Sequence, residues 1–165
     1  VAYCKVFYPL AYYCAYFSIR ANAFDYEKMA MGRDKLEYFI DDYKNKKSLG
    51  TITNTEEDEL KDMRIVQEMY ARGYDFIPID IYKAKARSFQ IIDGKIMPSF
   101  ASIAGMGLKA AQQLEEAAKG GTFTSKEDIR IRGKVSKTIL DVMEELGILG
   151  DLPETNQYDF FGMLK

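Results

Sequence analysis

The chain has 165 residues, of which 47% are hydrophobic and 29% are charged. This composition is typical of a folded globular protein and excludes a chain that is disordered throughout. The 23 lysine and arginine residues against 25 acidic ones leave a net charge of −2, which excludes a strongly basic, histone-like protein. Any affinity for nucleic acid must therefore come from a local patch. Histidine is absent, so the usual metal ligand and general base is missing.

The first forty residues have the spacing of helices. Pro9 suits the first turn of a helix, and the residues from Leu10 to Ile19 leave almost no polar face. We therefore expect a core helix buried nearly all round, with an aromatic ligand pocket as the alternative. Helical spacing continues from Phe24 to Ile40, with Gly32 as an interruption.

Two cysteines and one apolar stretch bear on the cellular setting. Cys4 and Cys14 are too far apart for a disulfide if they share a helix, which favours a reducing, cytoplasmic protein. The stretch from Val6 to Ile19 is too short to span a bilayer and does not resemble a signal peptide, so no membrane contact is expected. Because the chain starts at Val1 without a methionine, we interpret it as the C-terminal piece of a longer protein.

The middle of the chain alternates polar connections with short elements. The polar residues from Asp41 to Glu59 predict a surface connection, and Thr55 with Asp58 resembles a capping box that opens a helix. Gly73 can end that helix, whose predicted apolar face comprises Leu60, Met63, Val66, Met69 and Tyr70. Residues 76–81 then alternate apolar and polar side chains around Pro78. Two short strands are predicted within Ser88–Met97, joined by a type I′ turn at Asp93-Gly94.

The residues from Phe100 to Leu114 follow the spacing of a helix-hairpin-helix motif. Gly105 and Gly107 permit positive φ and the close approach of a phosphate, and Met106 anchors the turn inward. Ala111 allows close packing of the helices, while the N-terminus of the second helix and Lys109 attract an anion. Such contacts touch only phosphate and sugar, so they predict duplex binding without sequence preference. An ordinary helical hairpin with a glycine turn is the alternative.

A basic cluster follows this motif. Ser125 and Asp128 form a capping box for a short helix, and the stretch after Gly121 could be a degenerate copy of the one before it. Between Lys126 and Lys137 five positive side chains face two negative ones. The residues predicted to make a second backbone contact are Arg130, Arg132, Gly133, Lys134 and Lys137. A solvated run of charges is the alternative, and a final helix around Val142 and Met143 ends at Gly147.

The tail carries an apolar segment just inside its polar end. Gln157, Tyr158, Asp159, Phe160 and Phe161 have the pattern of a short peptide whose side chains fill a groove on another protein. On residues alone, docking on its own domain and docking on a partner are equally open.

Short blocks spread over the whole chain follow a recognisable order. They are Lys5-Val6, Pro9 to Tyr13, Tyr16 to Ala21, Glu68-Met69, Arg72-Gly73, Ile79 to Tyr82, Pro98 to Phe100, Gly105 to Gly107, Phe123 to Asp128, Arg132 to Thr138, Leu152-Pro153 and Asn156-Gln157. In this order they resemble the C-terminal end of the PolC-type α subunit of bacterial DNA polymerase III, found in low-GC Gram-positive bacteria.

The resemblance implies a mainly α fold with a small β-hairpin, in which a helical fingers segment precedes a helix-hairpin-helix module. Residues 1–90 would end the polymerase fingers, residues 91–150 would form the duplex-binding domain, and residues 151–165 would be a clamp-binding tail. Residues 157–161 match the clamp-binding motif, although Tyr158 and Phe160 stand where leucines are usual. Phe7 and Tyr8 stand where the family often has histidines, so no histidine role carries over.

The resemblance also sets expectations for chemistry and partners. The catalytic carboxylates that bind two metal ions, with Mg²⁺ expected, belong to a palm domain before Val1, so this chain should hold no catalytic residue, metal or cofactor. The expected partners are duplex primer-template DNA, the β sliding clamp and the rest of the polymerase chain. Two alternatives remain: a stand-alone helix-hairpin-helix DNA adaptor and a purely structural domain. We expect the aromatic N-terminal part to expose patches that favour dimerisation in isolation.

Overall fold

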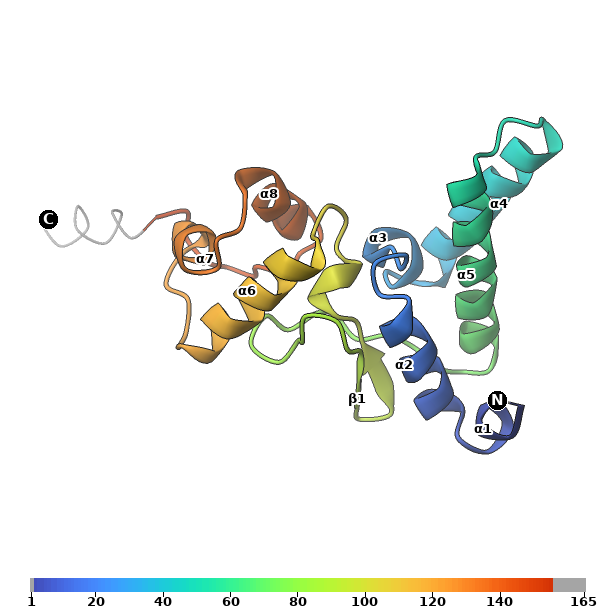
Figure 1. Cartoon of the computed structure of the whole chain (residues 1–165), viewed down its shortest axis with the longest axis horizontal. Coiled ribbons are helices and arrows are strands. Elements are labelled where there is room, and N and C mark those ends of the chain that lie inside the picture. The colour runs from blue at the N-terminus through green and yellow to red at the C-terminus, as the bar shows by residue number, and fades with distance from the viewer. Residues whose placement is uncertain (1, 156–165) are drawn as a thin grey trace, which may run out of the picture.

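The structure is a computed structural model that describes residues 2–155. It is mainly α-helical with one two-stranded antiparallel sheet, which confirms the predicted fold class. Helices α1 to α5 occupy one end of an elongated molecule, α6 to α8 occupy the other, and the β-hairpin lies between them (Figure 1). None of the helices in this described part is long and apolar enough to cross a membrane.

The N-terminal helices are α1 (Ala2–Phe7), α2 (Pro9–Ile19) and α3 (Tyr26–Met29). Pro9 occupies the first turn of α2, as predicted. The expectation that α2 is buried nearly all round is wrong, because only Tyr13 and Phe17 are buried and Ile19 is 72% exposed. An all-apolar helix has no polar stripe to mark its open side, so the sequence could not show which face packs.

The open side of α2 forms a shallow apolar groove with α1. Its lining includes Cys4, Tyr8, Tyr12 and Ile19. The two cysteines lie on adjacent helices and both are free, Cys4 exposed and Cys14 half-buried. The N-terminal part therefore presents a partly aromatic surface to solvent.

Two antiparallel helices, α4 (Arg33–Ser48) and α5 (Asn54–Ala71), form the far end of the molecule. The predicted surface connection from Asp41 to Glu59 is wrong except for residues 49–53, because its first part continues α4 and its last part begins α5. Ile40 and Tyr43 are buried at helical spacing, and the polar side chains between them lie on the solvated face. The exposed side of this part of α4 is almost entirely polar. Its composition therefore resembles that of a loop, and composition alone did not indicate a helix.

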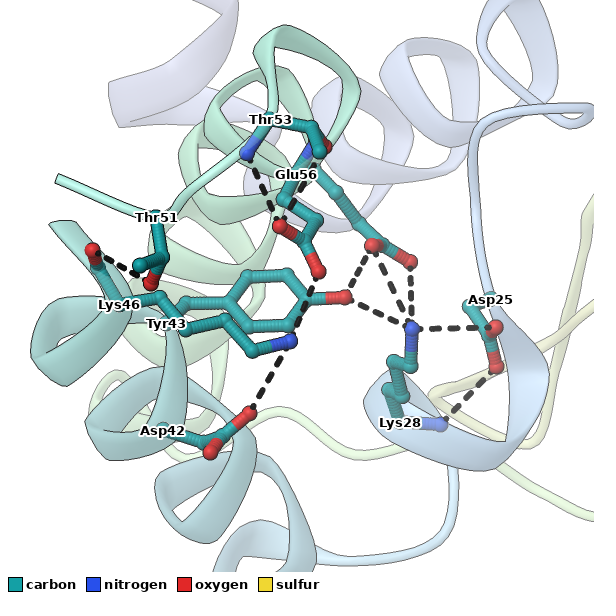
Figure 2. Close-up of polar contacts among 9 residues, drawn as sticks. Asp25, Lys28, Asp42, Tyr43, Lys46, Thr51, Thr53 and Glu56 are labelled. Carbon is teal, nitrogen blue, oxygen red and sulfur yellow. Dashed lines mark hydrogen bonds and ion pairs between the residues drawn. The ribbon is translucent and has the colours of Figure 1, made fainter.

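The N-terminus of α5 is capped two residues earlier than predicted. Thr53, and not Thr55, is the N-cap, and Glu56 completes the capping box in place of Asp58. The Glu56 N–H donates to Thr53 Oγ1 at 3.2 Å, and the Thr53 N–H donates to the Glu56 carboxylate at 3.0 Å (Figure 2). Lys46 pairs with the other oxygen of Glu56 at 2.8 Å, so the cap also ties α4 to α5.

A second polar cluster joins α3 to both of these helices. Lys28 donates to Tyr43 Oη at 2.8 Å and pairs with Glu59 at 3.3 Å, and its ammonium lies near Asp25 (Figure 2). The Tyr43 hydroxyl and the two carboxylates raise the pKa of Lys28 despite its burial. The cluster therefore links three helices through one fixed positive charge.

The β-hairpin joins the two ends of the molecule. Strand β1 (Gln90–Ile92) pairs with β2 (Lys95–Met97) through a turn at Asp93 and Gly94, whose φ values of 51° and 76° fit the predicted type I′ turn. Residues 76–81 form no strand beyond a single bridge between Phe76 and Ile96. Behind the hairpin, aromatic rings from three segments pack together: Phe17, Phe24, Phe76 and Phe89.

The remaining elements are a 3₁₀ turn η1 (Phe100–Ser102) and the helices α6 (Leu108–Lys119), α7 (Lys126–Arg132) and α8 (Lys137–Glu145). Helix α6 packs against both η1 and α7, and α7 packs against α8. The predicted domain boundary after residue 90 is not tested by this arrangement and stays a prediction.

Candidate nucleic-acid interface

The first hairpin, residues 103–107, connects η1 to α6. Met106 is 3% exposed and its N–H donates to the Ile103 carbonyl, so it anchors the turn inward as predicted. Ala111 is fully buried, which confirms its expected role in helix packing. The element before the hairpin is only one 3₁₀ turn, although the motif suggests an α-helix.

The two glycines of this hairpin have different backbone conformations. Gly105 has a φ of 81°, which favours glycine, but the prediction of positive φ at Gly107 is wrong because its φ is −69°. No atom lies within 4 Å of where a Cβ would stand at either residue. Gly107 is the exposed N-cap of α6 and supplies no side chain to cap the first N–H groups of the helix, and Lys109 two residues later is also exposed.

A second hairpin, residues 133–136, repeats this geometry between α7 and α8. Lys134 has a φ of 53° where the first hairpin has Gly105, and Val135 is 3% exposed where the first has Met106. Ser136, the N-cap of α8, has φ −68° and ψ 156°, close to the −69° and 165° of Gly107. Each position lies 29 residues after its counterpart, so the degenerate copy considered from the sequence is present in the structure.

Two of the predicted DNA-binding residues have structural roles. Gly133 is buried, and a Cβ there would lie 2.7 Å from the Ile129 carbonyl oxygen and 2.9 Å from Leu114 Cδ1. Arg132 donates to the carbonyls of Ala117, Gly121 and Thr122, each at 3.1 Å. These two residues hold α7 against the end of α6, and direct contact with DNA stays a prediction for them.

The capping of α7 differs in part from the prediction. Ser125 accepts from the Asp128 N–H as expected, but the Asp128 carboxylate accepts from the N–H of Thr124 and not from that of Ser125. That N–H and the Arg132 guanidinium hold the pKa of Asp128 below its usual range. The N–H groups of Lys126 and Glu127 donate to the carbonyls of Pro153 and Glu154, so a later segment closes this helix end.

The surplus of positive charge counted between Lys126 and Lys137 is smaller on the surface of the structure than in the sequence. Lys126 is largely buried between Glu144 and Glu154, which raise the pKa of its ammonium group. Arg130 is exposed and lies 4.0 Å from Glu127. Lys134 and Lys137 are exposed and form no ion pair within residues 2–155. The outward cations of this region are therefore Arg130, Lys134 and Lys137.

A groove of about 510 Å³ lies between α6 and the second hairpin. Lys109 from α6 and Lys134 from the second hairpin both line it, as does Arg132. Gln112 and Gln113, which the sequence analysis did not single out, line the same groove from α6. Their positions three and four residues after Lys109 place them on the same helix face, which was the available signal.

Two further predictions concern the clamp-binding residues of the tail and the binding of metal ions. The proposed clamp-binding residues, Gln157, Tyr158, Asp159, Phe160 and Phe161, lie outside the described residues. Within residues 2–155, no three Cys, Asp or Glu side chains come together in a way that could hold a metal ion.

Comparisons with known proteins agree with these observations. A family model described as a helix-hairpin-helix motif matches residues 73–158, more than half of the chain. The chain is also 42% identical over 161 residues to the DNA polymerase III PolC-type of Streptococcus thermophilus, and 42% identical to that of Streptococcus pyogenes. Each match covers 98% of this chain but only 11% of the relative's length. The resemblance noted in the sequence is thereby confirmed.

Proposed function

The chain belongs to the helix-hairpin-helix family, and on that premise we propose that it binds the backbone of duplex DNA as part of a replicative DNA polymerase. The observation that carries this proposal is that two equivalent hairpins occur, and that Lys134 of the second hairpin lines one groove with Lys109 of α6, the helix that follows the first. Two such elements could contact the backbone at two points. Within residues 2–155 neither Lys109 nor Lys134 forms an ion pair, and a purely structural role would not require such lysines at both places.

The groove and helix termini suggest how the backbone would bind. The open N-terminus of α6 would receive one phosphate, because its first N–H groups and the helix dipole favour an anion. Lys109, Lys134 and Lys137 would add charge, and the amides of Gln112 and Gln113 could donate to sugar or phosphate oxygens. None of these groups requires a particular base, so we expect binding without sequence preference.

The first experiment measures binding of the chain to a fluorescent duplex of mixed sequence at several salt concentrations. A triple substitution of Lys109, Lys134 and Lys137 by alanine should reduce the slope of log K against log salt by about 3, since each phosphate contact contributes about 0.9. The matched control replaces three exposed cations of α4 and α5, Lys44, Lys61 and Arg64, by alanine. Equal effects of both triple variants, or no duplex binding at low salt, would refute the proposal.

The PolC-type relatives suggest the larger context. We infer that the chain contributes duplex binding to a longer polymerase, whose nucleotide transfer uses Mg²⁺ in a separate palm domain. The chain alone is then expected to be inactive. Incorporation of nucleotides by the purified chain on a primer-template would contradict this inference.

The tail is proposed to tether that polymerase to the β sliding clamp. This proposal rests on the sequence of residues 157–161. Tethering would raise the effective concentration of the polymerase at its template. Binding of the chain to immobilised clamp should be lost when Gln157 and Phe161 are both replaced by alanine, and should persist in the triple lysine variant. Clamp binding that survives loss of these two residues would rule out the motif.

A further inference from the structure

Most lysine and arginine side chains of residues 2–64 form ion pairs, whereas those of the loop of residues 82–87 do not. Between residues 2 and 64 every lysine and arginine forms an ion pair except Lys44 and Arg64. In the loop of residues 82–87, however, Lys83 and Lys85 reach no acidic group in the described structure. Arg87 donates only to the backbone carbonyl of Ile19, at 3.3 Å. The loop therefore keeps three positive charges available to a ligand.

The backbone of this loop arranges the three cations on one side. Ala84 and Ala86 are each 5% exposed, and the residues that alternate with them, Lys83, Lys85 and Arg87, are exposed. The N–H groups of Phe100 and Ala101 donate to the carbonyls of Lys85 and Ala86, which fixes the segment beside η1. The loop thus buries its two alanines and presents its three cations to solvent as a row.

An exposed aromatic ring begins this row. Tyr82 stacks on Phe123, with ring centroids 6.0 Å apart and planes 26° from parallel. Its Oη accepts a hydrogen bond from the Phe123 N–H at 3.1 Å, so both ends of the side chain are held in place. Tyr82 is nevertheless 48% exposed. This is a fixed platform on which a planar group could stack.

The acidic groups next to the loop are already engaged by the backbone. The Asp80 carboxylate accepts from the Tyr82 N–H at 2.9 Å, and the Glu115 carboxylate accepts from the Ala86 N–H at 3.1 Å. These contacts fix the carboxylates beside the chain and do not neutralise the lysine ammonium groups directly. The loop retains its row of exposed cations.

The loop is distinct from the groove described above. None of its residues lines the groove that contains Lys109 and Lys134. In Figure 1 the light green loop lies below α6, whereas the yellow first hairpin lies above the start of that helix. A ligand on the loop would therefore occupy a second surface of the same helical module.

We propose that Tyr82, Lys83, Lys85 and Arg87 form a binding site for single-stranded DNA. An unpaired base stacks on Tyr82, and successive phosphates of the same strand pair with the three cations. Proteins that bind single strands combine an aromatic platform with a positively charged track in this way. A duplex offers the charges but keeps its base faces stacked inside, so the exposed ring favours a single strand. The site does not depend on duplex binding by the hairpins.

The test measures fluorescence anisotropy of a labelled twelve-residue oligothymidine with the intact chain. The triple variant Lys83→Ala, Lys85→Ala, Arg87→Ala should weaken binding at least tenfold at low salt and reduce the salt slope by about 2, since each single-strand contact contributes about 0.7. Tyr82→Leu should weaken binding at least fivefold through loss of stacking, whereas Tyr82→Phe should preserve affinity. The control is the triple variant of Lys44, Lys61 and Arg64, which removes the same charge from exposed positions. Thermal unfolding checks that each variant is folded.

The outcomes separate this site from the duplex-binding groove. The Lys109, Lys134 and Lys137 triple variant should leave oligothymidine binding within twofold of the original chain. Absence of oligothymidine binding by the original chain, or an equal loss in the control, overturns the proposal. If the loop variant loses duplex affinity as strongly as single-strand affinity, the loop belongs to the duplex footprint and the single-strand assignment is wrong. None of these results depends on whether the hairpin variant loses duplex binding.

Discussion

Lys134 occupies the same place in the second hairpin as Gly105 in the first, and both have positive φ, 53° and 81°. A non-glycine residue in this conformation costs about 1–2 kcal/mol. Lys134→Gly should therefore leave the free energy of unfolding unchanged or raise it by up to about 1 kcal/mol, because glycine also increases the entropy of the unfolded chain.

Loss of the Lys134 charge should have the opposite effect on DNA binding. Lys134→Gly should reduce the slope of log K against log salt for a duplex by about 0.9, which corresponds to one phosphate contact. Lys134→Ala removes the same charge but keeps the strained backbone, so it should be less stable than Lys134→Gly. Urea unfolding and duplex titration of both variants measure the two effects, and unchanged salt slopes would count against the hairpin contact.

Gly107 allows the helix N-terminus to be blocked with little effect on the fold. Its φ of −69° suits any residue and a Cβ would stand in open space, so Gly107→Glu should fold normally. The new glutamate carboxylate is attracted to the partial positive charge at the N-terminus of α6, and it repels a phosphate there. Duplex affinity should therefore fall at least tenfold. Gly107→Ala is the control and should bind DNA within about threefold of the original chain. Similar binding by the two variants would place the phosphate elsewhere.

Gly133 should tolerate substitution least among the glycines of the two hairpins. A Cβ would overlap the Ile129 carbonyl and the Leu114 side chain, so α7 must move away from α6. We expect Gly133→Ala to lower the free energy of unfolding by about 1–3 kcal/mol, measured by urea denaturation. Gly107→Ala meets no atom and should cost less than about 1 kcal/mol. Equal stability of these two variants would mean that the packing relaxes freely.

Asp128 should make part of the stability depend on pH. Its folded-state pKa is lowered by the Thr124 N–H and by Arg132, so its stabilising contribution is full above the unfolded pKa of about 3.9 and is lost as the pH falls through the folded value. Asp128→Asn should be less stable than the original chain at pH 7, and the difference should shrink towards pH 3. Urea midpoints at both pH values test this, with Asp141→Asn as the exposed control. A difference that is constant with pH would contradict the assignment.

Features of the fold set by neighbouring residues could be predicted from the sequence. The Asp93-Gly94 turn, the Ser125 N-cap and the inward Met106 each depend on a few adjacent positions. The open face of α2 could not be predicted, because its apolar residues surround the helix and only tertiary contacts select Tyr13 and Phe17 for burial. The local sequence pattern therefore predicted turns and helix caps better than it predicted which side chains are exposed.

The candidate site shows the same limit for charge. A count of residues between Lys126 and Lys137 gave Arg132 and Lys126 the same weight as Lys134. The structure commits Arg132 to three carbonyls that meet only after α6 and α7 have packed, and commits Lys126 to Glu144 and Glu154. Charge sign is visible in a sequence, but whether a charge is already neutralised depends on distant partners.

The contact of residues 153–154 with the first N–H groups of α7 has a consequence for how the chain is made. Lys126 finds its backbone partner in Pro153, 27 residues later in the chain. At about 5–20 residues per second, a ribosome needs more than one second to add that stretch. The first hairpin can close before the second has its final support. During synthesis the module should therefore pass through a half-assembled stage in which the first N–H groups of α7 still lack their partners in residues 153–154.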